Sequence, residues 1–328
     1  MENNIAIIGL GSIGARYLRL LRKFGFNTNI IVVRSGNGIP RMEEDYADKI
    51  VYSIKDAIEL GIDTAIIATP ATLHVDQAID LISSNIHVLI EKPLSNSLIN
   101  CDKLIKLQQQ IDVVVLLGYC LRYLPAAKKF KELILNKKVG DILEVHIQCK
   151  SYLPDWRPNQ NYKKSVSARQ ELGGGVLLEL SHELDYLIWF FGEIQSVKAK
   201  LHWSGNFGNI EDTADLMIQT KNDTNISVSL DFNSKVLKRN CIVTCSEGNL
   251  VWDILHNKIS IEYHDKSIDE KHYNEDYNFM YVKQLEHFFD CVENHNEPKI
   301  KITDGINVLK IIEAAKISNS NNEKVNIS

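Results

Sequence analysis

The first half of the chain alternates short apolar runs with amphipathic segments. The apolar runs have the composition and length of buried strands, and they lie at 5–8, 28–33, 64–69, 87–90 and 113–118, with a shorter run at 51–53. Helical spacing of apolar residues predicts helices between these runs, one ending before Gly25 and others at about 54–60, 74–83 and 97–110, while the polar residues 35–49 predict a loop. Apolar strands that alternate with helices are typical of a parallel sheet covered by helices on both faces.

The second half has a different pattern, in which strands follow one another without helices between them. We predict strands at about 142–148, 195–203, 213–220, 225–232, 240–245, 249–254 and 258–264. The helices expected here lie at about 124–136, 176–191, 277–294 and 304–317, and residues 151–170 are irregular. Consecutive strands with few helices indicate an open, mainly antiparallel sheet with one helix layer, and therefore an α+β second domain. We expect the substrate to bind between the two domains, beyond the carboxyl ends of the parallel strands.

Composition and charge narrow the class of protein. The chain has 328 residues, of which 45% are hydrophobic and 24% charged, and its net charge is −5. The sequence contains no long basic block, so it does not predict nucleic-acid binding. No apolar run has the length of a membrane span. The first strand begins almost at residue 1, which leaves no room for a signal peptide. Six scattered cysteines complete no zinc site, so we expect reduced thiols in a cytoplasmic protein.

Three glycines follow the first apolar run with the spacing G-x-G-x-x-G. Gly9 allows a tight turn, Gly11 lets a pyrophosphate approach the backbone, and Gly14 lets the helix pack closely on the strand. The helix N-terminus adds free N–H groups and the positive end of its dipole. The motif therefore predicts dinucleotide contacts from these glycines and from Ser12 and Ile13, and a glycine-rich turn of another α/β fold is the alternative.

The residues that follow the second strand bear on the choice of cofactor. An NAD site usually has an acidic residue there, which accepts hydrogen bonds from the ribose hydroxyls. This chain has Arg34 and Ser35 instead, and both side chains suit a 2′-phosphate. We therefore predict NADP, with NAD as the alternative if Arg34 only stacks on the adenine.

Glu91-Lys92-Pro93 ends a predicted parallel strand, where ligands gather in sheets of this class. Pro93 favours an extended backbone at Lys92, which directs the ammonium group toward the ligand. A solvated surface lysine is the alternative.

A second candidate lies on the predicted helix 176–191, which three consecutive glycines precede. Glu179, His182 and Asp185 are spaced three residues apart, so they share one helix face. A histidine beside carboxylates suits a general base, and a histidine that is hydrogen-bonded in the core is the alternative. No cysteine or second histidine nearby completes a ligand set, so we predict no metal site.

Other side chains at predicted strand ends and in the irregular segment suit substrate contacts. Tyr119 and Arg122 follow the strand that ends at Gly118, while Trp156 and Arg157 combine an apolar platform with polar donors. For each of them, a structural role is the alternative. With the two carboxylates of the second helix, the candidates are Tyr119, Arg122, Trp156, Arg157, Glu179 and Asp185.

Taken together, these motifs resemble the Gfo/Idh/MocA family of oxidoreductases, which includes glucose–fructose oxidoreductase and inositol dehydrogenases. The matching pieces are the glycine loop, Ala68-Thr69-Pro70 with His74, Glu91-Lys92-Pro93, the helix with His182 to Asp185, and Asp304-Gly305. The resemblance implies a Rossmann domain at 1–122, to which the helices of 277–328 return. It also implies an α/β substrate and oligomerisation domain at 123–276, and homodimers or homotetramers that form through the open sheet.

The resemblance also assigns roles to individual residues. It implies that Lys92 and His182 are catalytic, and it adds Thr69, Pro70, His74, Glu91 and Lys92 to the cofactor contacts. Many members have an aspartate four residues before the histidine, where this chain has Leu178. Glu179 or Asp185 is the candidate replacement for that carboxylate.

The implied activity is NAD(P)-dependent hydride transfer to or from a secondary alcohol or ketone of a sugar. The segments around Trp156 and His182 are similar to members linked to bacterial surface-glycan synthesis, which suggests a sialic-acid-like or nucleotide sugar. The alternative is a dinucleotide-binding regulatory protein without turnover, which the change at Leu178 leaves open.

Overall fold

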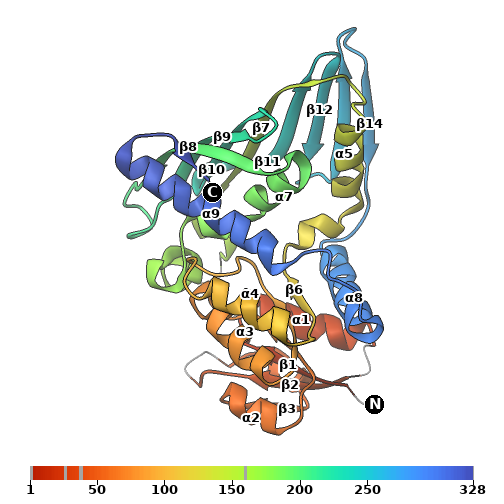
Figure 1. The fold of residues 1–328 in the computed structure, drawn as a ribbon, viewed down its shortest axis with the longest axis vertical. Helices are drawn as coiled ribbons and strands as arrows, with labels where there is room; N and C mark the ends of the chain where they lie inside the picture. The colour runs from red at the N-terminus through yellow and green to blue at the C-terminus, as the bar shows by residue number, and fades with distance from the viewer. Residues whose placement is uncertain (1–2, 26–27, 37–39, 159–160, 328) are drawn as a thin grey trace. The chain divides into compact units, whose positions relative to one another are not determined.

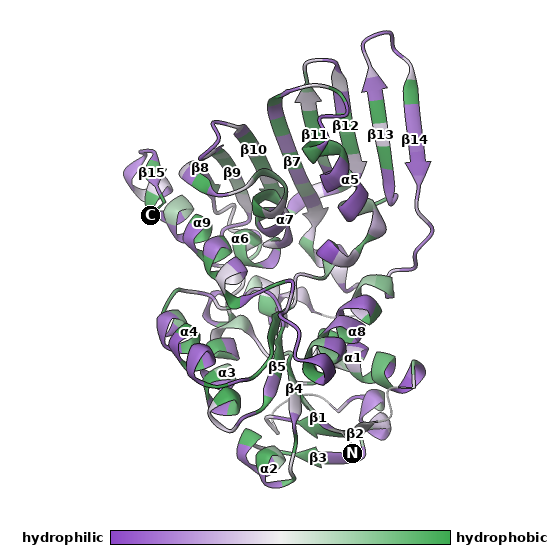
Figure 2. Cartoon of the chain, turned by 45° about the vertical axis from the view of Figure 1, so that its right-hand side comes forward, coloured by the Kyte–Doolittle hydropathy of each residue, from purple (hydrophilic) through white to green (hydrophobic). Residues whose placement is uncertain are grey.

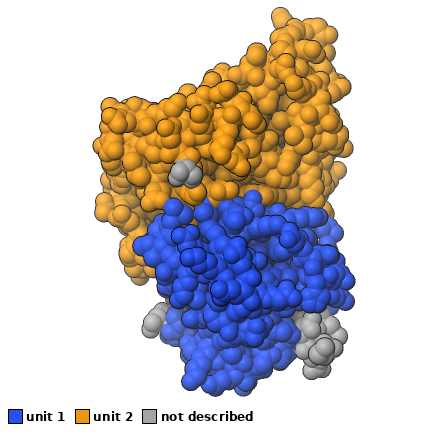
Figure 3. Space-filling model, in the orientation of Figure 1, with its two compact units in different colours: residues 1–119, 281–306 blue, residues 120–280, 307–328 orange. Residues whose placement is uncertain are grey.

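The computed structural model describes residues 3–25, 28–36, 40–158 and 161–327 (Figure 1). The chain forms two compact units, and each unit combines two separate stretches of sequence (Figure 3). Unit 1 comprises residues 1–119 and 281–306, and unit 2 comprises residues 120–280 and 307–328. The family resemblance implied that all of residues 277–328 return to the first domain. The structure differs there, because the last strand, Val325–Asn326 (β15), pairs with the sheet of unit 2.

Unit 1 is built around a six-stranded parallel sheet with the order β3-β2-β1-β4-β5-β6. Its strands are β1 (Asn3–Ile8), β2 (Thr28–Val33), β3 (Lys49–Val51), β4 (Thr64–Ile67), β5 (His87–Ile90) and β6 (Val115–Leu117). The order reverses between β1 and β4. In open α/β sheets, ligands bind beyond the carboxyl ends of the strands at such a reversal. The central strands consist mainly of hydrophobic residues (Figure 2). Consecutive residues along them are buried, so both faces of the sheet are covered, as the sequence pattern predicted.

Helices cover both faces of this sheet. The helices α3 (His74–Ser83) and α4 (Cys101–Gln110) lie on one face, and α1 (Ser12–Lys23) and α8 (Phe279–Asn294) lie on the other (Figures 1 and 2). A shorter helix, α2 (Ile54–Glu59), follows β3. Although α8 comes late in the sequence, it packs on α1, where the ring of Tyr17 meets the ring of Tyr281 edge-on with centroids 6.0 Å apart. The 35–49 segment, predicted as a loop, contains a 3₁₀ helix, η1 (Met42–Tyr46).

Unit 2 contains a nine-stranded sheet with the order β14-β13-β12-β11-β7-β10-β9-β8-β15. The strands other than β15 are β7 (Ile142–Tyr152), β8 (Ile194–His202), β9 (Thr213–Thr220), β10 (Asn225–Asp231), β11 (Asn233–Cys245), β12 (Gly248–Asp253), β13 (Lys258–Tyr263) and β14 (Ile268–His272). All pairs are antiparallel except β7 with β10. The first strand of this sheet therefore lies at its centre, between two strands that are consecutive in sequence.

One face of this sheet packs against α5 (Pro125–Leu135), α6 (Val176–Glu179) and α7 (His182–Phe191). Its core is aromatic: Phe130, Tyr186, Phe190 and Trp252 contact one another with ring centroids 5.3–6.0 Å apart. Along β8, β9 and β10, buried residues alternate with exposed or half-buried ones, which is the pattern of a sheet with one open face. The last long helix, α9 (Ile302–Asn321), borders β8, whose Ala199 N–H donates to Ser318 Oγ over 2.9 Å.

The single helix predicted for 176–191 is two helices, which is a correction that matters for the site. The α-helical backbone stops after Glu179 and restarts at His182, because Leu180 (φ −96°, ψ 29°) leaves the helical region. Apolar periodicity continues through the break and does not reveal it.

Two other expectations concern the cysteines and the membrane. All six cysteines are free thiols, and all six are buried. Among the helices in the described residues, none combines the length and the hydrophobicity that crossing a bilayer requires.

Candidate functional site

The glycine loop joins β1 to α1 and has the geometry of a phosphate-binding turn. Gly9 adopts φ +90°, and its N–H donates to Val33 O over 3.0 Å, which links the loop to the end of β2. A Cβ on Gly14 would lie 2.0 Å from Gly9 O, so the helix packs on the strand only because residue 14 is glycine. A Cβ on Gly11 would have its nearest neighbour at 4.0 Å. The space over Gly11 is therefore open, as the approach of a pyrophosphate requires.

The N-terminus of α1 completes this cradle. Gly11 is its N-cap, no side chain caps the helix, and its first turn contains no acidic residue. The first N–H groups of a twelve-residue helix therefore point at an exposed position with the positive end of the dipole behind them. Gly11 and Ser12 are exposed, and Ile13 is half-buried. These residues fit a dinucleotide pyrophosphate, and they lie beside the reversal of strand order between β1 and β4.

Arg34 and Ser35 follow β2 at the same edge of the sheet, as predicted. Arg34 N–H donates to Val51 O over 2.9 Å, and its side chain is only 10% exposed. Its guanidinium forms an ion pair with Glu44 of η1. The sequence did not single out Glu44, because it lies ten positions further along in a stretch with no strand signal.

The ends of β4 and β5 are tied together by His74, which is 1% exposed. Its Nδ1 lies 2.9 Å from Pro93 O and its Nε2 lies 2.8 Å from Thr69 O. Burial is the largest influence on this imidazole and lowers its pKa, while the bonds to the two carbonyls act in the opposite direction. Both ring nitrogens thus lie within hydrogen-bond distance of backbone carbonyls, so His74 shapes the strand ends. Thr69 and Pro70 beside it are half-buried.

Glu91 is 6% exposed and belongs to a buried hydrogen-bond chain in unit 1. Its carboxylate accepts hydrogen bonds from Tyr17 Oη and, over 3.1 Å, from Lys92 N–H. Tyr17 Oη in turn accepts one from Gln284 Nε2 over 2.6 Å. Burial raises the pKa of Glu91. The geometry makes Glu91 a positioning residue that holds the end of β5, while the side chain of Lys92 is half-buried. A partner as distant in sequence as Gln284 leaves no local signal.

His182 is the first residue of α7 in unit 2 and is half-buried. Both acidic residues that follow it on this helix are engaged by arginines. Arg239 Nε donates to Glu183 Oε1 over 2.7 Å. Arg122 forms a bidentate pair with Asp185, with Nε–Oδ2 at 2.9 Å and Nη2–Oδ1 at 2.5 Å.

These ion pairs change the interpretation of two predicted substrate residues. Arg122 is 8% exposed, and the Asp185 side chain is 1% exposed. The two residues bind each other in the interior of unit 2, so they anchor α7. Asp185 therefore supplies the helix anchor, not the carboxylate missing at Leu178, which is itself buried.

Glu179 is half-buried at the end of α6, on a separate helix from His182. A carboxylate that the sequence did not suggest lies at the other end of α6. Glu211 is 7% exposed, and its carboxylate atoms would lie only 2.4–2.6 Å from a Cβ on Gly175. Gly175 has φ +119°. The third glycine of the run thus makes room for Glu211, which burial shifts to a higher pKa.

The remaining predicted substrate residues differ in how exposed their side chains are. Trp156 is 36% exposed on η4 (Leu153–Trp156), where its Nε1 donates to Ser151 Oγ over 2.9 Å. Its ring meets Phe232 edge-on at 5.2 Å. Arg157 is half-buried, and Tyr119 is fully buried in unit 1. Trp156 and Arg157 thus remain accessible to a ligand, whereas Tyr119 packs in the core.

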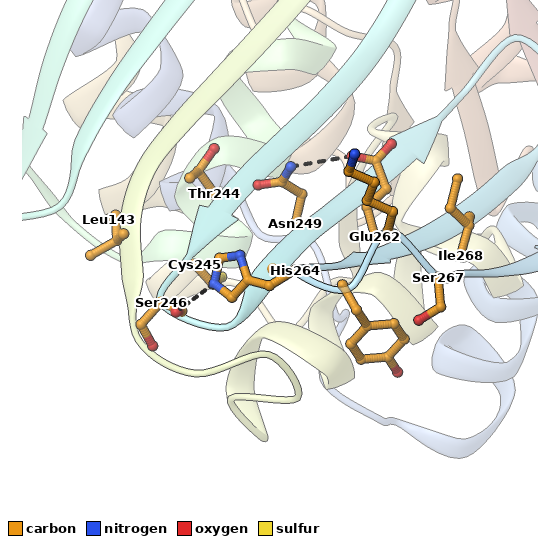
Figure 4. A pocket seen from close by; sticks show the side chains of 12 residues that line it. Leu143, Thr244, Cys245, Ser246, Asn249, Glu262, His264, Ser267 and Ile268 are labelled. Atoms are coloured by element: carbon orange, nitrogen blue, oxygen red, sulfur yellow. Dashed lines mark hydrogen bonds between the residues drawn. The ribbon is translucent and has the colours of Figure 1, made fainter.

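One hollow of about 410 Å³ opens on unit 2, beside β12, β13 and β14 (Figure 4). Within it, Asn249 Nδ2 donates to Glu262 Oε2 over 3.2 Å, and His264 Nε2 lies 2.9 Å from Ser246 O. None of the predicted site residues lines this hollow.

The predicted site residues form two sets. The cofactor residues and Lys92 belong to unit 1, and His182 and the residues that anchor its helix belong to unit 2.

Comparison with known protein families matches both halves of the chain. Residues 3–119 match the model for the oxidoreductase family NAD-binding Rossmann fold, and residues 131–327 match the model for its C-terminal alpha/beta domain. The chain belongs to the Gfo/Idh/MocA oxidoreductase family. The resemblance and the fold class predicted from the sequence are confirmed.

Relatives of known sequence include enzymes of sugar metabolism. An uncharacterized oxidoreductase of Synechocystis is 30% identical over 202 residues, which cover 60% of this chain and 53% of that protein. The 2,7-anhydro-N-acetylneuraminate hydratase of Escherichia coli is 26% identical over 219 residues, 64% of this chain and 56% of the hydratase. The glucose-6-phosphate 3-dehydrogenase of Bacillus subtilis is 25% identical over 241 residues, 68% and 66% of the two chains. The chain thus spans little more than half the length of the first two relatives.

Solved structures share the whole fold at low identity. Levoglucosan dehydrogenase in complex with NADH and levoglucosan has a TM-score of 0.86 and 18% identity, over 100% of both chains. The WlbA dehydrogenase of Bordetella pertussis in complex with NADH and UDP-GlcNAcA has a TM-score of 0.86 and 17% identity, over 100% of this chain and 98% of that one. At these identities, the match shows the common fold.

Proposed function

We propose that this protein is an NAD(P)-dependent oxidoreductase that acts on a secondary alcohol or ketone of a sugar. The observation that carries the proposal is the open space over Gly11 in front of the uncapped N-terminus of α1. It fits a dinucleotide, in a chain that also has Lys92 at the end of β5 and His182 at the start of α7. A bound nicotinamide would supply or accept the hydride.

In this proposal, the side chains of the chain handle the charge and the proton of the substrate oxygen. The Lys92 ammonium donates a hydrogen bond to the reacting oxygen and stabilises negative charge as the carbonyl forms or disappears. His182 exchanges the hydroxyl proton, the usual work of an imidazole near neutral pH. Glu91 holds Lys92 through its backbone N–H, and the Arg122–Asp185 pair holds the helix that begins at His182.

The narrower substrate class is a sialic-acid-like or nucleotide sugar used for a bacterial surface glycan. Two likenesses support it: a relative that is an anhydro-N-acetylneuraminate hydratase, and a structure of the same fold solved with UDP-GlcNAcA. Trp156 and Arg157 supply an accessible apolar platform next to a cation, which suits a sugar ring that carries an acidic group.

The test is turnover by purified full-length protein, with NAD(H) and NADP(H) and a panel of hydroxy- and keto-sugars, followed by nicotinamide absorbance. We expect Lys92→Met and His182→Ala each to lower kcat by at least about 10²-fold, the usual contribution of general acid–base catalysis, with dinucleotide binding retained. The matched control is Lys106→Met, because Lys106 is exposed on α4. Parental turnover by folded Lys92→Met and His182→Ala variants would remove their assigned roles.

A regulatory protein of the same fold is the second candidate, and Leu178 is the observation that favours it. Leu178 is buried at a position where many family members carry an aspartate, and Asp185, one of the two candidate replacements, is engaged by Arg122. Dinucleotide binding without an absorbance change across the whole panel would support this candidate over the enzyme.

A further inference from the structure

The end of β2 is placed directly beside the glycine loop. Val33 O accepts a hydrogen bond from Gly9 N–H, and the next residue, Arg34, is fixed by its own N–H to Val51 O. In a Rossmann site, the residues after the second strand face the 2′ position of the adenosine ribose. The charges gathered here therefore decide whether that position carries a hydroxyl group or a phosphate.

Arg34 does not present an isolated positive charge at this point. Its guanidinium is paired with Glu44, and the two side chains are only 10% and 24% exposed. The Glu44 carboxylate also accepts a hydrogen bond from Arg41 N–H over 3.0 Å. The carboxylate is thus held from two directions, and it reduces the positive field of Arg34 where that field would meet the ribose.

The segment that carries Glu44 is itself anchored to the domain. Arg22 of α1 donates to Tyr46 O over 2.7 Å, and it also pairs with Asp48. The Asp48 carboxylate accepts a hydrogen bond from Ile30 N–H of β2 over 2.7 Å. These contacts tie η1 to the helix and the strand on either side of it, so the position of Glu44 is part of the fold of unit 1.

We propose that Glu44 sets the dinucleotide preference of this chain, favouring NAD(H) over NADP(H). A 2′-phosphate would have to compete with Glu44 for Arg34 and would be repelled by the carboxylate. A 2′-hydroxyl can instead donate a hydrogen bond to an acidic group, as it does in other NAD sites. Glu44 supplies this acidic group from η1, not from the residues directly after β2. The sequence prediction considered only Arg34 and Ser35 and therefore favoured NADP. The inference rests on the proposed function, because it assumes that the glycine loop binds a dinucleotide.

The experiment measures the dissociation constants of NADH and NADPH for the full-length protein and its Glu44→Gln variant at one ionic strength. We expect the wild type to prefer NADH. Loss of the Glu44 charge should shift the ratio of the two constants toward NADPH by about tenfold, the factor that corresponds to about 1.4 kcal/mol. The shift should shrink in high salt, since partly exposed charges are screened.

Glu43→Gln is the matched control. It makes the same change of charge one residue earlier, where the partner is Arg19 on α1, so it should leave the ratio unchanged. Arg34→Gln tests the pair from the other side and does not depend on the folding of Glu44→Gln. It leaves the carboxylate without its guanidinium, and it should strengthen the preference for NADH.

The outcomes separate this inference from the proposed function. A wild type that prefers NADPH overturns the inference, and so does a Glu44→Gln ratio equal to that of Glu43→Gln; in both cases the dinucleotide site stands. A folded wild type that binds neither dinucleotide overturns the proposed function and this inference with it.

Discussion

The Arg122–Asp185 pair gives a stability prediction whose size follows from its burial. The two side chains are 8% and 1% exposed and are joined by two hydrogen bonds. Arg122→Met keeps most of the aliphatic stem but leaves the Asp185 carboxylate in the interior without its two donors. Removing one partner of a buried ion pair costs about 3–5 kcal/mol, which is a large part of the about 5–15 kcal/mol stability of a typical domain.

The double variant separates the loss of a partner from the loss of packing. In Arg122→Met/Asp185→Leu neither charge of this pair remains in the interior, and exchange of a buried pair for apolar residues is often neutral or stabilising. We expect the double variant to recover most of the loss caused by Arg122→Met alone. The control is Lys129→Met, which removes the exposed pair with Glu132 on α5. Exposed pairs contribute about 0–1 kcal/mol.

Urea unfolding followed by tryptophan fluorescence measures the free energies of unfolding of these variants, and its signal comes from unit 2. All four tryptophans (156, 189, 203 and 252) belong to unit 2, and Trp189 lies 5.7 Å from the Arg122 guanidinium. The signal therefore reports unit 2 whether or not unit 1 unfolds in the same transition. A free energy of unfolding for Arg122→Met equal to that of Lys129→Met would refute the reasoning, and so would a double variant no more stable than Arg122→Met.

Two further predictions concern unit 1. Gly14→Ala should lower the melting temperature, because its Cβ would lie 2.0 Å from Gly9 O. Gly11→Ala should leave the melting temperature unchanged and weaken NADH binding, because its Cβ enters the open space over the loop. Equal effects of the two changes on melting temperature and on NADH binding would contradict this prediction. His74 should make stability fall as the pH drops below its ordinary pKa of 6.5, because burial lowers the pKa in the folded protein and the unfolded chain then binds the extra proton. Denaturation at several pH values should therefore show a steeper loss toward low pH for the wild type than for His74→Asn, and parallel curves would count against it.

Much of unit 1 could be predicted from the sequence because its signals are local. Each parallel strand is a short apolar run, and each run ends at a glycine, a proline or a polar residue that remains at the carboxyl edge in the fold. Gly9, Arg34 and Lys92 were placed at that edge on this basis, and the structure has them there. The predicted roles of these residues are a different matter and remain to be tested by binding and turnover.

The parts that escaped prediction depend on partners that are distant in sequence. The central position of β7 in its sheet follows from pairing with β10 and β11, which come much later in the chain. The exposed strand β14 has no apolar alternation, since all five of its residues are exposed. The pairs Arg239–Glu183 and Arg122–Asp185 join residues more than fifty positions apart, so the helix pattern around His182 contained no sign that its carboxylates were engaged.

The hydrogen bond from Gln284 to Tyr17 has a consequence for the synthesis of the chain. The two residues are 267 positions apart, and all but the last 22 residues of unit 2 lie between them. A ribosome therefore exposes the α1 face of the nascent first sheet long before α8 exists to cover it. During that interval Tyr17 and its apolar neighbours are available to chaperones and to other nascent chains. The interleaved order of the two units thus places the greatest risk of misassembly on the domain that is translated first.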